Sequence, residues 1–143
     1  MSSKSFYAKQ GRLDYISNLC KGKNVLDIGC IGSYRHHTSN PNRWLFYRAM
    51  QRAKKIKGID LNKQAVDILR SEGYEDLIFH ENAEKMSTDC KYDVVIAGEL
   101  IEHLNNPGLF VEACRKLVHA NGVLVLSTPN IYALEFVYRP LLG

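Results

Sequence analysis

With 143 residues, of which 45% are hydrophobic and 24% charged, the chain has the composition of one folded domain and not of a disordered protein. No apolar run approaches the roughly 18 residues of a membrane span, and the first residues lack the apolar core of a signal peptide. We therefore expect a single cytoplasmic domain over residues 1–143. The formal net charge is +4, and the cations from Arg35 to Lys57 follow one another without an acidic residue.

Helical and strand patterns alternate along the chain. Apolar residues at helical spacing predict a first helix over residues 5–19, which Gly22 ends. A buried strand over residues 25–28 follows. A second helix is expected from Trp44 onward, with Asn42 as its candidate cap and apolar positions as far as Ile56. The elements expected after it are a strand over 56–60, a helix between Asn62 and Gly73, strands over 77–80 and 92–97, a helix from Asn106-Pro107 to Asn121-Gly122, and a strand over 123–128.

The five predicted strands are continuous apolar runs and not alternating ones. This pattern is typical of a parallel sheet covered by helices on both faces, so the fold class is α/β with a doubly wound sheet. Ligands of such sheets bind beyond the carboxyl ends of the strands. Those ends are rich in small or acidic residues, namely Asp27-Ile28-Gly29, Asp60, Asn82-Ala83 and Ala97-Gly98-Glu99.

Five segments, in order, resemble the motifs of class I S-adenosylmethionine-dependent methyltransferases. They are Val25-Leu26-Asp27-Ile28-Gly29-Cys30, Ile59-Asp60, Glu81-Asn82-Ala83-Glu84, the run from Tyr92 to Leu104, and the run from Gly122 to Asn130. The resemblance covers residues 20–132. It implies a Rossmann-like sheet of five predominantly parallel strands in the order 3-2-1-4-5 with flanking helices, and S-adenosylmethionine as the cofactor.

The resemblance also implies roles for individual residues. Asp27, Gly29, Cys30 and Gly32 would form the loop beside the methionine moiety, with Asp27 near its ammonium group. Asp60 would accept hydrogen bonds from the ribose hydroxyls. The remaining cofactor contacts would come from Leu61 against the adenine, Asn82 and Ala83 at its polar edge, and the carbonyl of Ala97 or Gly98 at the ammonium.

The sequence departs from the family at three places. Ile31 stands where a glycine is common, and Asn82 stands where an aspartate is common. An amide oxygen still accepts a hydrogen bond, so adenine recognition is altered but retained. The segment between Gly32 and Asp60 is longer than usual, which predicts an insertion in the first crossover.

The cluster of Glu99, Glu102 and His103 after the fourth strand has three interpretations. Glu99 and His103 are catalytic candidates, with His103 as a general base. A similar set binds a metal in small-RNA 2′-O-methyltransferases with the help of a later histidine, but no histidine follows His119 here, so no metal is expected. In the third interpretation the cluster only orients loops by hydrogen bonding.

Methyltransferases of this class continue with two more strands, for which the 15 residues after Thr128 leave no room. We therefore expect a domain that is incomplete at its C-terminus and lacks the sixth and seventh strands. Its fifth strand would be an exposed apolar edge, so the chain would be either a truncated product or a domain completed by a partner or by a second copy of the chain.

The leading functional hypothesis is methyl transfer to a small molecule or to a glycan or lipid precursor. One alternative is a non-catalytic or partner-completed cofactor-binding module. The other is RNA methylation, suggested by the basic stretch with Trp44, Phe46 and Tyr47, although these aromatics fit a buried helix face equally well and nucleic acid is not the expected partner. A nicotinamide dehydrogenase is disfavoured, because Gly29-Cys30-Ile31-Gly32 lacks the initial G-x-G.

Overall fold

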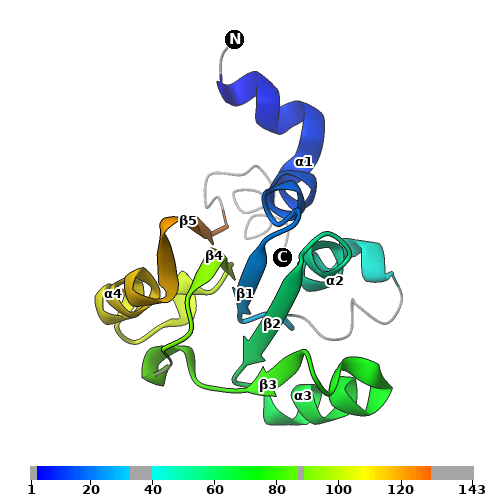
Figure 1. Ribbon diagram of the computed structural model, residues 1–143, viewed down its shortest axis with the longest axis vertical. Helices are drawn as coiled ribbons and strands as arrows, with labels where there is room; N and C mark the ends of the chain where they lie inside the picture. Colours follow the sequence, from blue (N-terminus) through cyan, green and yellow to red (C-terminus); the bar gives the residue numbers. More distant parts are fainter. Residues whose placement is uncertain (1–2, 33–39, 87–88, 130–143) are drawn as a thin grey trace, which may run out of the picture.

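The computed structural model describes residues 3–32, 40–86 and 89–129, with side chains from residue 11 onward. Its centre is a sheet of five parallel strands in the order β3-β2-β1-β4-β5, which confirms the predicted fold class and strand order (Figure 1). The strands are β1 (Asn24–Ile28), β2 (Lys55–Asp60), β3 (Ile78–His80), β4 (Tyr92–Gly98) and β5 (Val118–Ser127).

Helices cover both faces of this sheet (Figure 1). They are α1 (Ser3–Leu19, broken at Gly11), α2 (Leu45–Met50), α3 (Lys63–Leu69) and α4 (Pro107–Leu117). Successive side chains of a strand point to opposite faces. Accordingly Leu26 of β1 packs with Phe110 of α4, whereas its neighbour Val25 packs with Ile16 of α1. The continuous apolar strands of the sequence are therefore explained by burial on both sides.

The second predicted helix differs from the structure at both ends. Asn40, and not Asn42, caps the chain there, because its side-chain oxygen accepts a hydrogen bond from the Asn42 N–H at the start of a 3-10 turn. The α-helix ends at Met50 and does not continue towards Ile56. The Lys54 N–H instead donates to the Lys23 carbonyl at 2.9 Å, so the chain leaves the helix to pair with the turn before β1.

The last helix is also shorter than predicted. α4 begins as expected, with the Asn106 side chain accepting from the Leu109 N–H and Pro107 in the first turn. It ends at Leu117, and β5 begins at Val118, five residues earlier than expected. Gly122 lies inside this strand at a register irregularity, where a Cβ would approach the Asp93 carbonyl oxygen to 2.8 Å. The glycine therefore permits close strand contact and does not end the helix.

Among the described residues, β5 is one of the two edge strands of the sheet, and β3 is the other. Val123 and Leu126 on β5 are 44% and 39% exposed, in keeping with the apolar edge expected there. None of the helices in the described part of the chain is long and apolar enough to cross a membrane.

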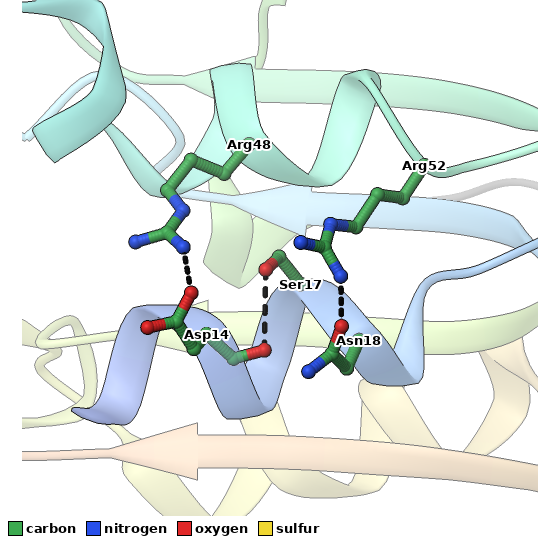
Figure 2. A network of polar contacts seen from close by, with 5 residues as sticks. All are labelled: Asp14, Ser17, Asn18, Arg48 and Arg52. Atoms are coloured by element: carbon green, nitrogen blue, oxygen red, sulfur yellow. Dashed lines mark hydrogen bonds and ion pairs between the residues drawn. The ribbon is translucent and has the colours of Figure 1, made fainter. Parts of the chain in front are cut away.

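Two arginines of the basic stretch hold α1 against α2 (Figure 2). Arg48 forms an ion pair with Asp14, and Arg52 donates a hydrogen bond to the Asn18 side chain one helical turn further on. Ser17 lies between them and donates to the Asp14 carbonyl at 3.2 Å. These two cations are therefore engaged within the chain, and they fix α1 against α2 and the turn that follows α2.

Candidate functional site

A cavity of about 580 Å³ opens at the carboxyl ends of the strands, and we call it the first cavity. Most of the residues predicted to bind the cofactor line it, together with both catalytic candidates. They are Gly29 and Gly32 after β1, Asp60 and Leu61 at the end of β2, Asn82 and Ala83 after β3, and Gly98, Glu99 and His103 at the end of β4 and beyond. The parallel sheet thus brings together, at the carboxyl ends of its strands, four segments that are far apart in the sequence.

The second cavity, of about 350 Å³, shares Gly29, Gly32, Gly98 and Glu99 with the first. Its lining includes two predicted cofactor residues that do not line the first cavity, Asp27 and Cys30, and it also contains Arg12, Arg43 and Trp44. The last predicted residue, Ala97, is buried within β4 and lines neither cavity.

The loop after β1 is pinned to β2 by its backbone. Gly29 and Gly32 have φ angles of +71° and +54°, a left-handed conformation that favours glycine. The N–H groups of Gly29 and Cys30 both donate to the Ile59 carbonyl, at 2.8 and 3.2 Å. Ile31, the departure from the family pattern, is buried in the apolar cluster that contains Trp44. A side chain is therefore accommodated at this position by packing into the core.

Asp60 is the polar centre of the first cavity. Its Oδ2 accepts a hydrogen bond from the Ile31 N–H at 3.0 Å, and its Oδ1 accepts one from the Asn62 N–H at 2.9 Å. A carboxylate offers about four acceptor positions, so two hydrogen bonds leave capacity for ligand hydroxyls. Beside it, the Leu61 side chain is 64% exposed. An exposed leucine at a cavity wall provides an apolar surface for a flat ring.

Asn82 and Glu84 shape the wall of the first cavity after β3. The Asn82 side-chain oxygen accepts from the Glu84 N–H at 2.8 Å and so caps the 3-10 turn Ala83–Lys85. The Glu84 carboxylate accepts from the Asn106 N–H at 2.9 Å and from the Asn105 amide at 3.1 Å, and these hydrogen bonds lower the pKa of Glu84. Glu84 thus ties this turn to the start of α4, a role that local sequence does not reveal.

Glu99 lies in the wall shared by the two cavities, where residues from other segments hold it in place. Its carboxylate pairs with the Arg12 guanidinium of α1 at 2.7 Å, and Arg12 also donates to the Ser127 hydroxyl at 2.8 Å. The Glu99 backbone has a φ of +53°, and its N–H donates to the Ser127 carbonyl at 2.7 Å. Sequence reasoning missed Arg12, because its partners are contributed by segments far along the chain.

His103 lies on the 3-10 turn Ile101–His103, with its exposed side chain in the lining of the first cavity. Its backbone N–H donates to the Leu100 carbonyl at 2.9 Å, which fixes the turn. Within residues 3–32, 40–86 and 89–129, no group of three or more His, Cys, Asp or Glu side chains is arranged to hold a metal ion.

Asp27 is the buried acid of the second cavity, with only 3% of its surface exposed. Burial raises the pKa of its carboxyl group from an ordinary 3.8 to about 8, and the nearby charge of Asp60 adds to the effect. The same burial raises the pKa of the Cys30 thiol, which is therefore not a reactive thiolate. A cation bound beside Asp27 would relieve the unfavourable burial of negative charge.

Comparisons with known proteins agree with this geometry. The methyltransferase domain family matches residues 26–126. A ubiquinone biosynthesis O-methyltransferase of Azoarcus is 32% identical over 127 residues, and one of Neisseria meningitidis is 34% identical over 131 residues. Each comparison covers 83% of this chain and 50% of the relative, so the chain spans about half the length of the curated relatives that it matches.

A solved structure also shares the fold. An S-adenosylmethionine-dependent methyltransferase from Clostridium acetobutylicum has a TM-score of 0.63 at 16% identity, over 94% of this chain and 59% of that protein. At this level of identity the likeness concerns the arrangement of strands and helices, which is the arrangement that forms the two cavities.

Proposed function

Since the methyltransferase domain match spans most of the chain, the protein belongs to the class I S-adenosylmethionine-dependent methyltransferases, and on this premise we propose that it binds S-adenosylmethionine and transfers its methyl group to a small-molecule hydroxyl. The observation that carries this proposal is the convergence of Gly29, Asp60, Asn82 and Gly98 on one cavity at the carboxyl edge of the sheet. The small-molecule acceptor is suggested by the two O-methyltransferase relatives.

The residues of the first cavity suit the nucleoside half of the cofactor. The remaining acceptor capacity of Asp60 matches two ribose hydroxyls, and charge-assisted hydrogen bonds of this kind are strong. The exposed Leu61 would pack against the adenine ring. Asn82 and the Ala83 N–H would contact the polar edge of that ring.

The glycines shared by the two cavities suit the methionine half. The left-handed turns at Gly29 and Gly32 let the loop backbone approach a ligand closely. The backbone of Ala97 and Gly98 at the end of β4 would accept hydrogen bonds from the ammonium group. Asp27 is a buried acid near the same group, and the ammonium would favour its ionised form, while Cys30 fills the space beneath the loop.

When bound, S-adenosylmethionine supplies an activated methyl group on a sulfonium, and the protein aligns the acceptor with it. His103 lies in the lining of the cavity and is our candidate for taking the acceptor proton. Glu99, held in place by Arg12, would present its carboxylate oxygens as hydrogen-bond acceptors to the reacting groups. These are the two residues that we assign to catalysis.

Ligand-dependent stability tests the cofactor assignment. S-adenosylhomocysteine, the product form of the cofactor, should raise the free energy of unfolding by about 2.7 kcal/mol at 100 times its dissociation constant. No change in the unfolding midpoint at millimolar ligand would contradict the proposal. Transfer of a labelled methyl group to a panel of phenols and catechols tests the acceptor class. Binding without transfer to any of them would favour a cofactor-binding module over an enzyme.

A further inference from the structure

Three segments meet beside Gly98, in the wall that separates the two cavities. α1 contributes Arg12, the end of β4 contributes Glu99, and the end of β5 contributes Ser127. A Cβ added to Gly98 would lie 3.5 Å from the Ser127 hydroxyl and 3.9 Å from the Arg12 guanidinium. The contact between Arg12 and Ser127 therefore lies within reach of any ligand that passes along Gly98 from one cavity to the other.

The ion pair between Arg12 and Glu99 would be loose without further support. The side chains of Arg12 and Glu99 are 43% and 50% exposed, and exposed ion pairs contribute little order or stability by themselves. The Ser127 hydroxyl accepts from the same guanidinium nitrogen that contacts Glu99. This additional hydrogen bond, anchored on a strand of the sheet, restricts the orientation of Arg12.

Ser127 also supports the backbone of Glu99. A residue with a Cβ rarely adopts a φ of +53°, and such conformations persist where neighbouring contacts enforce them. The hydrogen bond from the Glu99 N–H to the Ser127 carbonyl, at 2.7 Å, is such a contact. One residue therefore holds both members of the ion pair, through its side chain and through its backbone.

We infer that Ser127 is a positioning residue of the cofactor site, which keeps Arg12 and Glu99 in the wall between the two cavities. The inference rests on the proposed function, because it assigns to that wall a contact with the methionine half of the cofactor. Ser127 acts through Arg12 and does not itself line either cavity. Arg12 also needs α1 to be held in place, and the contacts of Asp14 with Arg48 and of Asn18 with Arg52 hold this helix (Figure 2).

The test measures the dissociation constant of S-adenosylhomocysteine by calorimetry. It also uses the fluorescence of Trp44, the single tryptophan, which lines the second cavity. Ser127→Ala should raise the dissociation constant about threefold to tenfold, the effect of one ordinary hydrogen bond, because the contact with Arg12 is exposed. Ser127→Thr, which keeps the hydroxyl, should restore the binding. Ser71→Ala is the matched control, because its hydroxyl donates to the Ile68 carbonyl on an exposed turn, and it should leave binding unchanged.

A second pair of variants separates positioning from general destabilisation. In an Arg12→Ala background, Ser127→Ala should have no further effect on the dissociation constant, because the two residues act together. An equal effect in both backgrounds, or a fall in the unfolding midpoint of the ligand-free protein that accounts for the weaker binding, would overturn the inference. Unchanged binding by Ser127→Ala would overturn it too, while leaving the proposed function intact. Wild-type protein that does not bind S-adenosylhomocysteine would overturn the proposed function itself.

Discussion

The carboxylate of Asp60 accepts a hydrogen bond from the N–H of Ile31, a residue 29 positions earlier in the chain, at 3.0 Å. The end of β2 thus fixes the shape of the glycine-containing loop after β1. The same carboxylate accepts from the Asn62 N–H and so also orders the start of α3. Structural support of the loop and the proposed recognition of the ribose therefore depend on one side chain.

Replacing Asp60 by alanine should affect both stability and binding. The N–H groups of Ile31 and Asn62 lose their acceptor, which should lower the free energy of unfolding by about 1–3 kcal/mol. The dissociation constant for S-adenosylhomocysteine should rise by at least about tenfold, because two charge-assisted hydrogen bonds are lost. Urea denaturation and calorimetry measure the two effects.

Asp67 provides the matched control for this variant. Among the described residues, its carboxylate pairs with Lys63 alone, on the exposed face of α3, at 2.6 Å. Asp67→Ala should change the free energy of unfolding by less than about 0.5 kcal/mol and leave binding unchanged. Wild-type affinity in Asp60→Ala would contradict the assignment of Asp60 to the ribose.

Asp27 should make the ligand-free protein less stable as the pH rises. Its carboxyl pKa is near 3.8 in the unfolded chain and about 8 in the folded one, so the folded state holds the proton more tightly. The free energy of unfolding should therefore fall between about pH 4 and pH 8 and level off above that range. Asp27→Asn, which stays neutral, should remove this slope and be more stable at pH 8, by on the order of 5 kcal/mol at most. Denaturation curves at several pH values measure these free energies. If the free energy of unfolding depends on pH in the same way in wild type and in Asp27→Asn, Asp27 does not have the raised pKa.

The same acid should couple cofactor binding to proton release. A cationic ligand beside Asp27 favours the ionised carboxylate, so binding below pH 8 should expel a proton. The apparent affinity for S-adenosylhomocysteine should rise with pH up to about 8. The binding enthalpy at pH 7 should vary with the ionisation enthalpy of the buffer. Asp27→Asn should abolish the variation, and a variation that persists in it would assign the proton to another group.

His103 should be required for turnover and not for cofactor binding. If it accepts the acceptor proton, His103→Gln should lower kcat by about 100-fold or more, the typical contribution of a general base. The dissociation constant for S-adenosylhomocysteine should stay within about twofold. His119→Gln is the matched control, because His119 is exposed at the start of β5, at the other end of this strand from Ser127. Equal turnover in the two variants would leave only an orienting role for His103.

The parallel sheet and its order follow from features that are local in the sequence. Each strand is an apolar run that ends at glycine, proline or an acidic residue, and the alternation with helices leaves few arrangements. Helix ends are less predictable. Val118 continues the apolar spacing of α4, and Asn121-Gly122 has the form of a helix end. In the structure, however, Val118 pairs with Tyr92 of β4 and belongs to β5. Only the neighbouring strand shows this.

The site residues divide in the same way. Gly29, Asp60, Asn82 and Gly98 can be found from the sequence, because each lies at the carboxyl end of a strand or within two residues of it. Arg12 cannot be found in this way, since its hydrogen-bond partner Ser127 lies 115 residues away. Nothing in the sequence near Arg12 indicates that its side chain lines a cavity. Residues that act through distant partners become visible only when the fold brings those partners together.

Gly58 is the glycine in β2 that the core requires. A Cβ at this position would lie 2.7 Å from both the Cys30 Sγ and the Phe46 ring, closer than such atoms approach one another. Gly58→Ala should therefore lower the free energy of unfolding by about 1–3 kcal/mol, because Cys30 and Phe46 are buried and cannot move away freely. Since Cys30 belongs to the cofactor loop, the dissociation constant for S-adenosylhomocysteine should rise as well.

Gly108→Ala in the first turn of α4 is the control for this variant. A Cβ at Gly108 would meet only the Asn106 side chain, at 3.5 Å, so the protein should be unchanged or more stable by up to about 1 kcal/mol. Equal stability of the two variants would mean that the loop and α2 are not packed against β2 as described.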